Sequence, residues 1–149
     1  MKVYFFAFSV LLLQIAVFPE FLSFQNITPD ILTVFVIIFT LKNDFFRSIK
    51  LASFIGILQD LLSPLDLVFN TTIKIFIASL TYLLKDRFNY TNIVVKGFFL
   101  IFIIFCDIFL RSFLLFLKTG IFEIPSFSFF YILVNFILFY IVVLKDEYR

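Results

Sequence analysis

The chain has 149 residues and a formal net charge of +2, and 63% of its residues are hydrophobic while 15% are charged. Soluble domains average roughly 45–50% apolar and about 25% charged residues, so this composition excludes an ordinary soluble domain. Apolar runs separated by short polar clusters predict instead an all-α, polytopic integral membrane protein. No stretch is long enough for a second, soluble domain, and we expect a single six-helix membrane domain over residues 1–149.

Six apolar segments predict six transmembrane helices, at about 3–18, 29–41, 48–62, 67–84, 93–117 and 126–144. The first follows Lys2 and resembles a signal peptide. It is followed by Pro19-Glu20-Phe21 rather than by a cleavage site with small residues. We therefore expect this segment to be retained as the first span.

The second segment opens with Thr28-Pro29-Asp30. Thr28 suits an N-cap, Pro29 the first helical position, and Asp30 the positive end of the helix. At 1.5 Å per residue this segment is roughly 20 Å long, against a hydrocarbon core of about 30 Å. The third segment is short as well. A re-entrant pair is the alternative, but the basic connection at 42–50 favours true crossings.

Basic residues alternate along the chain with the predicted spans. If the chain crosses the membrane six times, nine basic residues lie at turns or ends on one side of the membrane and one lies on the other side. The nine are Lys2, Lys42, Arg47, Lys50, Lys85, Arg87, Lys96, Lys145 and Arg149, against Lys118 alone. Because cytoplasmic loops carry an excess of Lys and Arg, we expect both termini to be cytoplasmic.

Asp107 and Arg111 lie four residues apart in the fifth predicted span, which places them on one helix face. A charge within the hydrocarbon is costly unless it is paired or faces a polar cavity. We expect an ion pair that fixes this helix in the bundle, and the alternative is a proton or ion relay. Lys74, in the fourth span, can snorkel outward or pair with Asp60 or Asp66, and we predict a contact with Asp60.

Small residues follow one face of the third predicted span. Ala52, Gly56 and Asp60 are spaced i, i+4, i+8, and Pro64 ends the segment. Small residues at this spacing let a second helix approach closely within a membrane. Asp60 then lies at the outer end of the close-packed face. Helix packing, a structural lock and docking of a partner all fit this spacing.

Two stretches in this region carry a family resemblance. PDILTVFVIIFTLKNDFF, followed after a turn by SFIGILQDLLSPLD, resembles MreD, the rod-shape-determining membrane protein of bacteria. The family has Pro-Asp opening the second helix and a G-x-x-x-D-L-L…P-L-G stretch ending the third. Asp66 stands where the family usually has glycine. The matching residues are Pro29, Asp30, Gly56, Asp60, Leu61, Leu62, Pro64 and Leu65. We expect the contacts of helix packing or partner docking to involve Pro29, Asp30, Ala52, Gly56, Asp60 and Pro64.

The resemblance implies a non-catalytic scaffold in the bacterial cytoplasmic membrane, without cofactor or metal. MreD-like proteins act with MreC, a single-span membrane protein, in the cell-elongation machinery that includes RodA, a class B penicillin-binding protein and the MreB filament. They help place lateral peptidoglycan synthesis and maintain rod shape. Their fold is similar to the substrate-capture subunits of energy-coupling-factor transporters. Bound lipid and homo-oligomers are compatible with this role.

A small-molecule-binding subunit of a transporter is the alternative. Those subunits carry Ala-x-x-x-Ala on the first span, whereas Ala7 and Ala16 are nine residues apart here, and the chain has no tryptophan. A saturable thermal shift with a vitamin would favour this function. An enzyme is disfavoured because the chain has no histidine and no nucleophile beside a base. Nucleic-acid binding has no support, since the basic residues follow the topology.

Overall fold

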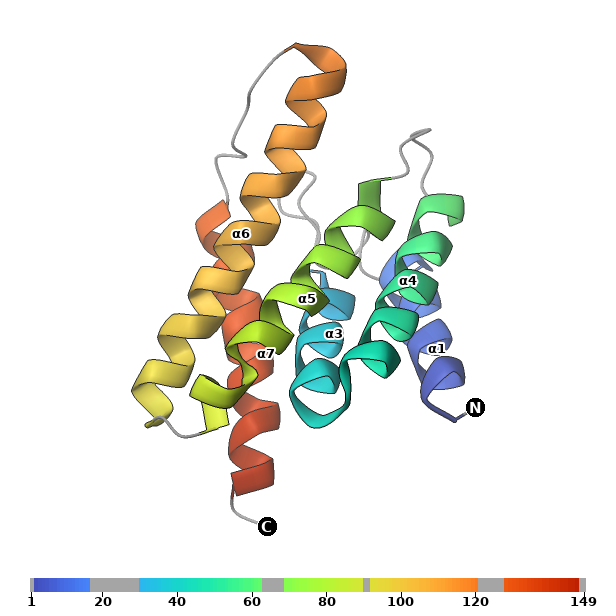
Figure 1. The fold of residues 1–149 in the computed structure, drawn as a ribbon. Coiled ribbons are helices and arrows are strands. Elements are labelled where there is room, and N and C mark those ends of the chain that lie inside the picture. The colour runs from blue at the N-terminus through green and yellow to red at the C-terminus, as the bar shows by residue number, and fades with distance from the viewer. Residues whose placement is uncertain (1, 17–29, 63–68, 90–91, 121–127, 148–149) are drawn as a thin grey trace.

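The computed structural model describes residues 2–16, 30–62, 69–89, 92–120 and 128–147. Within these ranges the chain forms helices and no strand, which confirms the all-α prediction (Figure 1). The helices lie within a few residues of the predicted segments. They are α1 (Lys2–Ala16), α3 (Ile31–Lys42), α4 (Phe45–Leu62), α5 (Phe69–Asn89), α6 (Ile93–Thr119) and α7 (Ser128–Glu147).

The ends of two helices are fixed by recognisable caps. Asp30 is the N-cap of α3, and its Oδ1 accepts a hydrogen bond of 3.2 Å from the backbone N–H of Thr33. The sequence had assigned the cap to Thr28, which lies outside the described residues. At the end of α6, Gly120 has φ +73°, a left-handed conformation that favours glycine, and its N–H donates to the Phe116 carbonyl at 2.8 Å.

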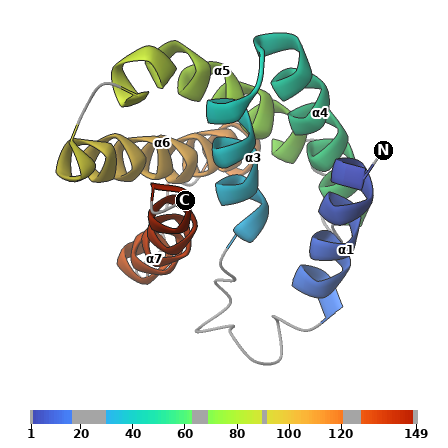
Figure 2. The ribbon, with the colours of Figure 1, turned by 90° about the horizontal axis from the view of Figure 1, so that it is seen from below.

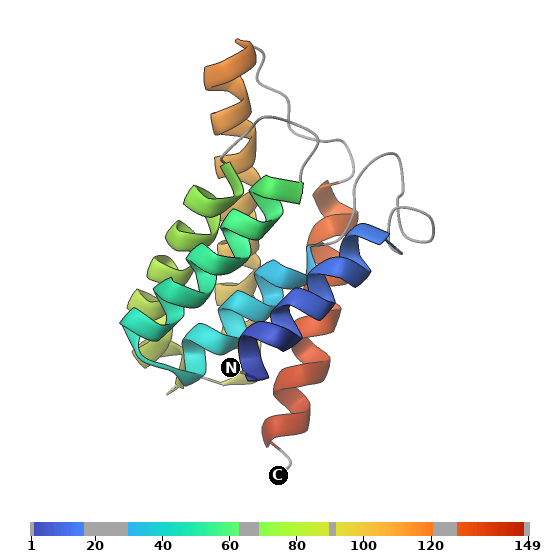
Figure 3. The same cartoon turned by 90° about the vertical axis from the view of Figure 1, so that its right-hand side faces the viewer.

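Four helices form a ring in the order α3, α5, α6, α7, with α7 packing back against α3. Across this four-helix ring, among the described residues, no Cα of α5 lies within 8 Å of a Cα of α7. The same holds between α3 and α6. Helices α1 and α4 pack against α3 on its other side (Figure 2). Helix α4 also runs beside α5 as an antiparallel neighbour (Figure 3).

Two apolar clusters follow from this arrangement, and α3 contributes to both. One lies within the four-helix ring, with Ile37 of α3, Ile77 of α5, Ile104 of α6 and Phe139 of α7 among its members. The other lies between α1, α3 and α4 and includes Leu11, Leu32, Val36, Leu51, Ala52 and Ile55. Helix α3 is therefore packed on two sides, which explains why six of its twelve residues are buried.

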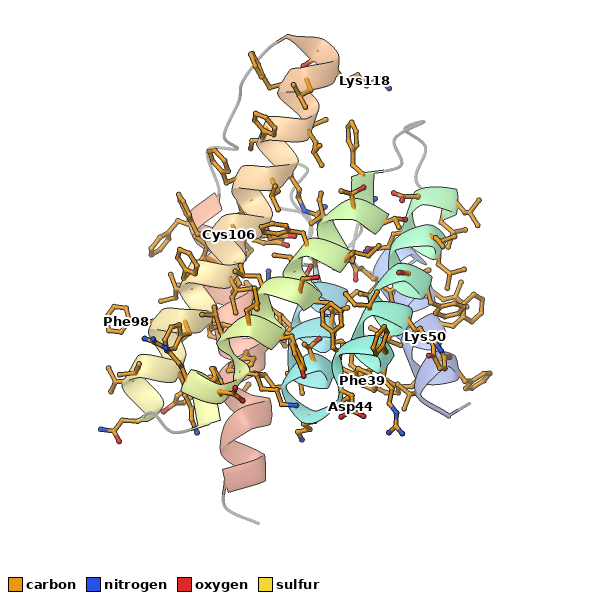
Figure 4. The ribbon with its side chains drawn as sticks, viewed as in Figure 1. Phe39, Asp44, Lys50, Phe98, Cys106 and Lys118 are labelled. Atoms are coloured by element: carbon orange, nitrogen blue, oxygen red, sulfur yellow. The ribbon has the colours of Figure 1, made fainter. Side chains whose placement is uncertain are left out.

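The start of α1, the α3–α4 turn, the end of α5, the start of α6 and the end of α7 all lie at one end of the bundle (Figure 1). The basic residues at or near these ends of α3, α4, α5 and α6 are Lys42, Arg47, Lys85, Arg87 and Lys96. Lys118 stands at the opposite end (Figure 4). The alternation of helix directions that the charge pattern predicted is thus present in the fold.

Large apolar side chains cover much of the outer surface. Phe46, Leu83 and Phe129 are each 77% exposed, and Phe98 points away from the bundle on α6 (Figure 4). By length and composition, one helix of the described part can cross a membrane, over Val94–Thr119. Three further apolar helical stretches are shorter, at Val3–Leu12, Ile31–Lys42 and Phe129–Ile141.

Candidate functional site

The carboxylate of Asp30 lies buried at the start of α3 and contacts two cations from other helices. Its Oδ2 forms ion pairs with Nζ of Lys74 on α5 and, at 2.7 Å, with Nη2 of Arg111 on α6. The Lys74 side chain is fully buried, whereas that of Arg111 is one-third exposed. A buried charge is stable only when it is paired and hydrogen-bonded, and Asp30 supplies this pairing to both cations.

Polar side chains from three more positions complete the surroundings of Asp30. Thr33 Oγ1 donates to Asp30 Oδ2 at 2.9 Å and accepts a hydrogen bond from Lys74 Nζ. The side-chain amides of Gln14 on α1 and Gln59 on α4 each point an N–H at Asp30 Oδ1, at 3.5 Å. One carboxylate therefore contacts side chains from α1, α3, α4, α5 and α6.

Arg111 extends these contacts to the last helix. Its Nε donates to Asp107 Oδ2 at 3.2 Å and its Nη1 donates to Asn70 Oδ1 at 3.3 Å. The hydroxyl of Tyr131 on α7 donates to the same Asp107 oxygen at 2.8 Å. We call this set the Asp30 cluster: Gln14, Asp30, Thr33, Gln59, Asn70, Lys74, Asp107, Arg111 and Tyr131. It joins all six described helices, and its two acids balance its two bases.

The sequence predicted part of this cluster correctly. The Asp107–Arg111 ion pair is confirmed. The predicted contact between Asp60 and Lys74 is wrong, and Lys74 does not snorkel outward, because Asp30 and Thr33 offer it partners inside the four-helix ring. Asp66, the other acid considered for Lys74, lies outside the described residues.

Asp60 instead caps α5 from the neighbouring helix. Its carboxylate accepts from the backbone N–H groups of Asn70 at 2.9 Å and of Thr71 at 3.0 Å, and from the Thr71 hydroxyl at 2.6 Å. Asn70 and Thr71 are the second and third residues of α5, whose N–H groups have no partner within the helix. Asp60 thus performs the work of an N-cap residue, although it belongs to α4.

One turn below Asp60, Gly56 permits close packing of α4 on α5. A Cβ at Gly56 would lie 2.8 Å from the backbone N of Thr71 and closer still to its Cα. Ala52, a further turn away, is fully buried. The packing interpretation of this face is confirmed, but α5 of the same chain occupies it, so Gly56 is not open to a partner. Pro29 and Pro64 lie outside the described residues.

The sequence had assigned no role to Gln14, Gln59 and Tyr131. It had assigned Asp30 to packing or partner docking at a helix end, and not to the pairing of Lys74 and Arg111. Gln14 and Gln59 did carry a signal, since each is an uncharged polar residue within an otherwise apolar helical stretch. Among the described residues, no three His, Cys, Asp or Glu side chains gather in a way that could hold a metal ion. The chemistry that the Asp30 cluster offers is hydrogen bonding and ion pairing between helices.

Comparisons with protein-family models, with curated proteins and with solved structures found no match for this chain.

Proposed function

We propose that the chain is a non-catalytic, multi-pass membrane scaffold of the MreD type that binds an MreC-like single-span protein. The observation that carries this proposal is the position of three residues from the MreD-like pattern. Asp30, Gly56 and Asp60 each lie at a contact between helices, where they join α3, α4 and α5 to the rest of the bundle. Residues of the pattern that stabilise contacts between helices suit a protein that acts as a structural scaffold.

The distribution of polarity supports a membrane location. The four charges of the Asp30 cluster lie inside, while phenylalanine and leucine side chains cover the outside. Soluble monomers rarely expose contiguous apolar patches larger than a few hundred Å², whereas lipid tails accept such a surface. We propose six spans in the bacterial cytoplasmic membrane, with the basic end of the bundle and both termini in the cytoplasm.

The partner surface is argued from the exposed members of the pattern. Leu61 is 75% exposed at the end of α4 beside Asp60, so it contributes little to the packing of the described residues, and the adjacent Leu62 is 45% exposed. We propose that the apolar span of the MreC-like protein packs here. RodA, a class B penicillin-binding protein and MreB follow as further partners of the same machinery, and lipid or a second copy can cover the remaining apolar surface.

Co-purification tests this function. The tagged chain is expressed with the MreC-like protein from a neighbouring reading frame, and the pair is expected to elute together from detergent extracts. Leu61→Ser should lower recovery of the partner at least several-fold. The matched control is Leu83→Ser, which changes an equally exposed leucine of α5 outside the pattern. Elution of the wild-type chain without the partner would defeat the scaffold proposal, and equal recovery with both variants would defeat the docking surface.

Cysteine labelling tests the topology separately. Cys106 is the only cysteine, so Cys106→Ser provides a background without thiols. Asn43→Cys and Ser63→Cys are then expected to react with an impermeant maleimide from opposite sides of the membrane. Labelling from the same side would contradict a crossing by α4.

A further inference from the structure

Side chains reach across the four-helix ring at two levels. The diagonal pairs of helices stay more than 8 Å apart, Cα to Cα, throughout the described residues. At the upper level the Asp30 cluster spans the ring through Lys74, Asp107 and Tyr131. At the lower level the rings of Phe88 on α5 and Phe139 on α7 meet edge to face, with centroids 5.9 Å apart.

Between these two levels, α5 and α7 each present a small polar side chain. Thr81 lies seven residues after Lys74 and seven before Phe88, so helical periodicity places the three on one face of α5. Asn135 lies four residues after Tyr131 and four before Phe139, on one face of α7. Both side chains are fully buried. They therefore belong to the layer between the Asp30 cluster and the two aromatic rings.

Several polar atoms of this layer have no hydrogen-bond partner among the residues that the structure describes. This holds for Thr81 Oγ1, for both Oδ1 and Nδ2 of Asn135, and for Asp107 Oδ1 at the top of the layer. More than about 90% of buried polar groups in proteins are hydrogen-bonded, and leaving one unsatisfied is unfavourable. Unsatisfied polar atoms on three residues of the same four-helix ring indicate that a further molecule forms hydrogen bonds with them.

We propose that the centre of the four-helix ring is a water site, in which ordered water bridges Thr81 and Asn135 and reaches Asp107 Oδ1. The combined set of a hydroxyl, an amide and a carboxylate oxygen both donates and accepts hydrogen bonds, as water requires. The charge balance argues against an ion. Asp107 is already paired with Arg111, and a metal cation in the ring would leave an unbalanced charge among apolar neighbours such as Ile77 and Ile104.

Water-edited solid-state NMR of the full chain in lipid vesicles tests this site directly. Magnetisation from water should reach the side-chain amide of Asn135 about as fast as that of Asn43, which lies at the end of the bundle. It should be several-fold slower in reaching the methyl groups of Ile77. The Asn135 signal is assigned as the one that disappears in Asn135→Leu. Build-up at the Asn135 amide as slow as at the Ile77 methyls would overturn the proposal.

A double-mutant cycle tests the bridge between the two helices. Thr81→Val and Asn135→Leu each remove polar atoms at nearly constant volume. If one water network joins them, the change in Tm of the double variant should differ from the sum of the single changes by at least about 2 °C. Additive changes would overturn the bridge. Should Asn135→Leu yield no folded protein, Asn135→Ala replaces it in the cycle, and the NMR measurement on the unchanged chain still decides whether water is present.

Discussion

Nη2 of Arg111 on α6 lies 2.7 Å from Oδ2 of Asp30 at the start of α3, although 81 residues separate the two in sequence. Lys74 shares the same carboxylate oxygen. Asp30 therefore compensates the charges of both Lys74 and Arg111. Without it, Asp107 would be the one remaining acid of the Asp30 cluster to balance these two cations. The stability of the fold is expected to depend more on this carboxylate than on any other acid of the described part.

Asp30→Asn should destabilise the protein by about 3–5 kcal/mol, because it leaves a net positive charge among buried groups. Thermal unfolding in detergent micelles, followed by circular dichroism, measures the loss. Asp44→Asn is the matched control. Asp44 is 80% exposed and pairs with Arg47 at 3.8 Å, so its replacement should change stability by less than about 1 kcal/mol. Equal effects of the two substitutions would contradict a central role for Asp30.

Lys74→Met should recover part of the stability that Asp30→Asn removes. Methionine keeps the length of the side chain without its charge. The Asp30 cluster of the double variant is therefore neutral again, with one acid, Asp107, and one base, Arg111. We expect Asp30→Asn with Lys74→Met to be at least about 1 kcal/mol more stable than Asp30→Asn alone. A double variant no more stable than Asp30→Asn would show that hydrogen bonding, rather than charge balance, determines the effect.

Gly56→Ala and Gly97→Ala should act in opposite directions. Both glycines lie within helices, where alanine is favoured over glycine by about 1 kcal/mol. At Gly56 the added Cβ meets the backbone of α5, which cannot yield locally, so we expect a net loss of about 2 kcal/mol or more. At Gly97 the nearest atom is in the Phe136 ring, 3.3 Å away, and a side chain can shift.

Unfolding titrations of the two glycine variants therefore provide an internal comparison. Gly97→Ala is expected to be neutral or slightly stabilising, whereas Gly56→Ala is destabilising. If Gly56→Ala is as stable as the unchanged chain, the close approach of α4 and α5 described above does not exist in solution.

Asp60→Ala should cost about 1–2 kcal/mol, the usual effect of removing an N-cap, because the first turn of α5 loses its acceptor. Asp60→Asn retains one side-chain oxygen and should cost less. Hydrogen exchange locates the effect. The amides of Asn70 and Thr71 should exchange faster in Asp60→Ala, while those near Lys85 at the other end of α5 should remain unchanged. Uniform acceleration along α5 would contradict a cap.

The helices were predictable because their apolar residues form runs that short polar turns interrupt. Their ends were less accurate. The predicted fourth segment stops at 84, whereas α5 continues to Asn89, since the polar stretch after Leu84 remains helical beyond the apolar run. The hydropathy of the sequence locates the apolar part of a helix, but the helix itself can extend into the polar residues that follow.

The contacts of the candidate site were predictable only between residues that lie close together in the sequence. Asp107 and Arg111 are four residues apart, so helical periodicity alone places them together. The partner of Lys74 is 44 residues away, and its identity depends on how α3 and α5 pack. Asp30 lies at a helix end, as the sequence predicted, but nothing in its immediate neighbours indicated that this helix end contacts side chains from four other helices.

The four charges of the Asp30 cluster fall into two pairs along the chain. Asp30 and Lys74 lie within the first part, from α3 to α5, and Asp107 and Arg111 lie within α6 alone. During synthesis, each pair can therefore be neutral before the other is made. Under the membrane location proposed above, Arg111 would need no distant residue to enter the bilayer with its charge compensated, and the contact with Asp30 would form later.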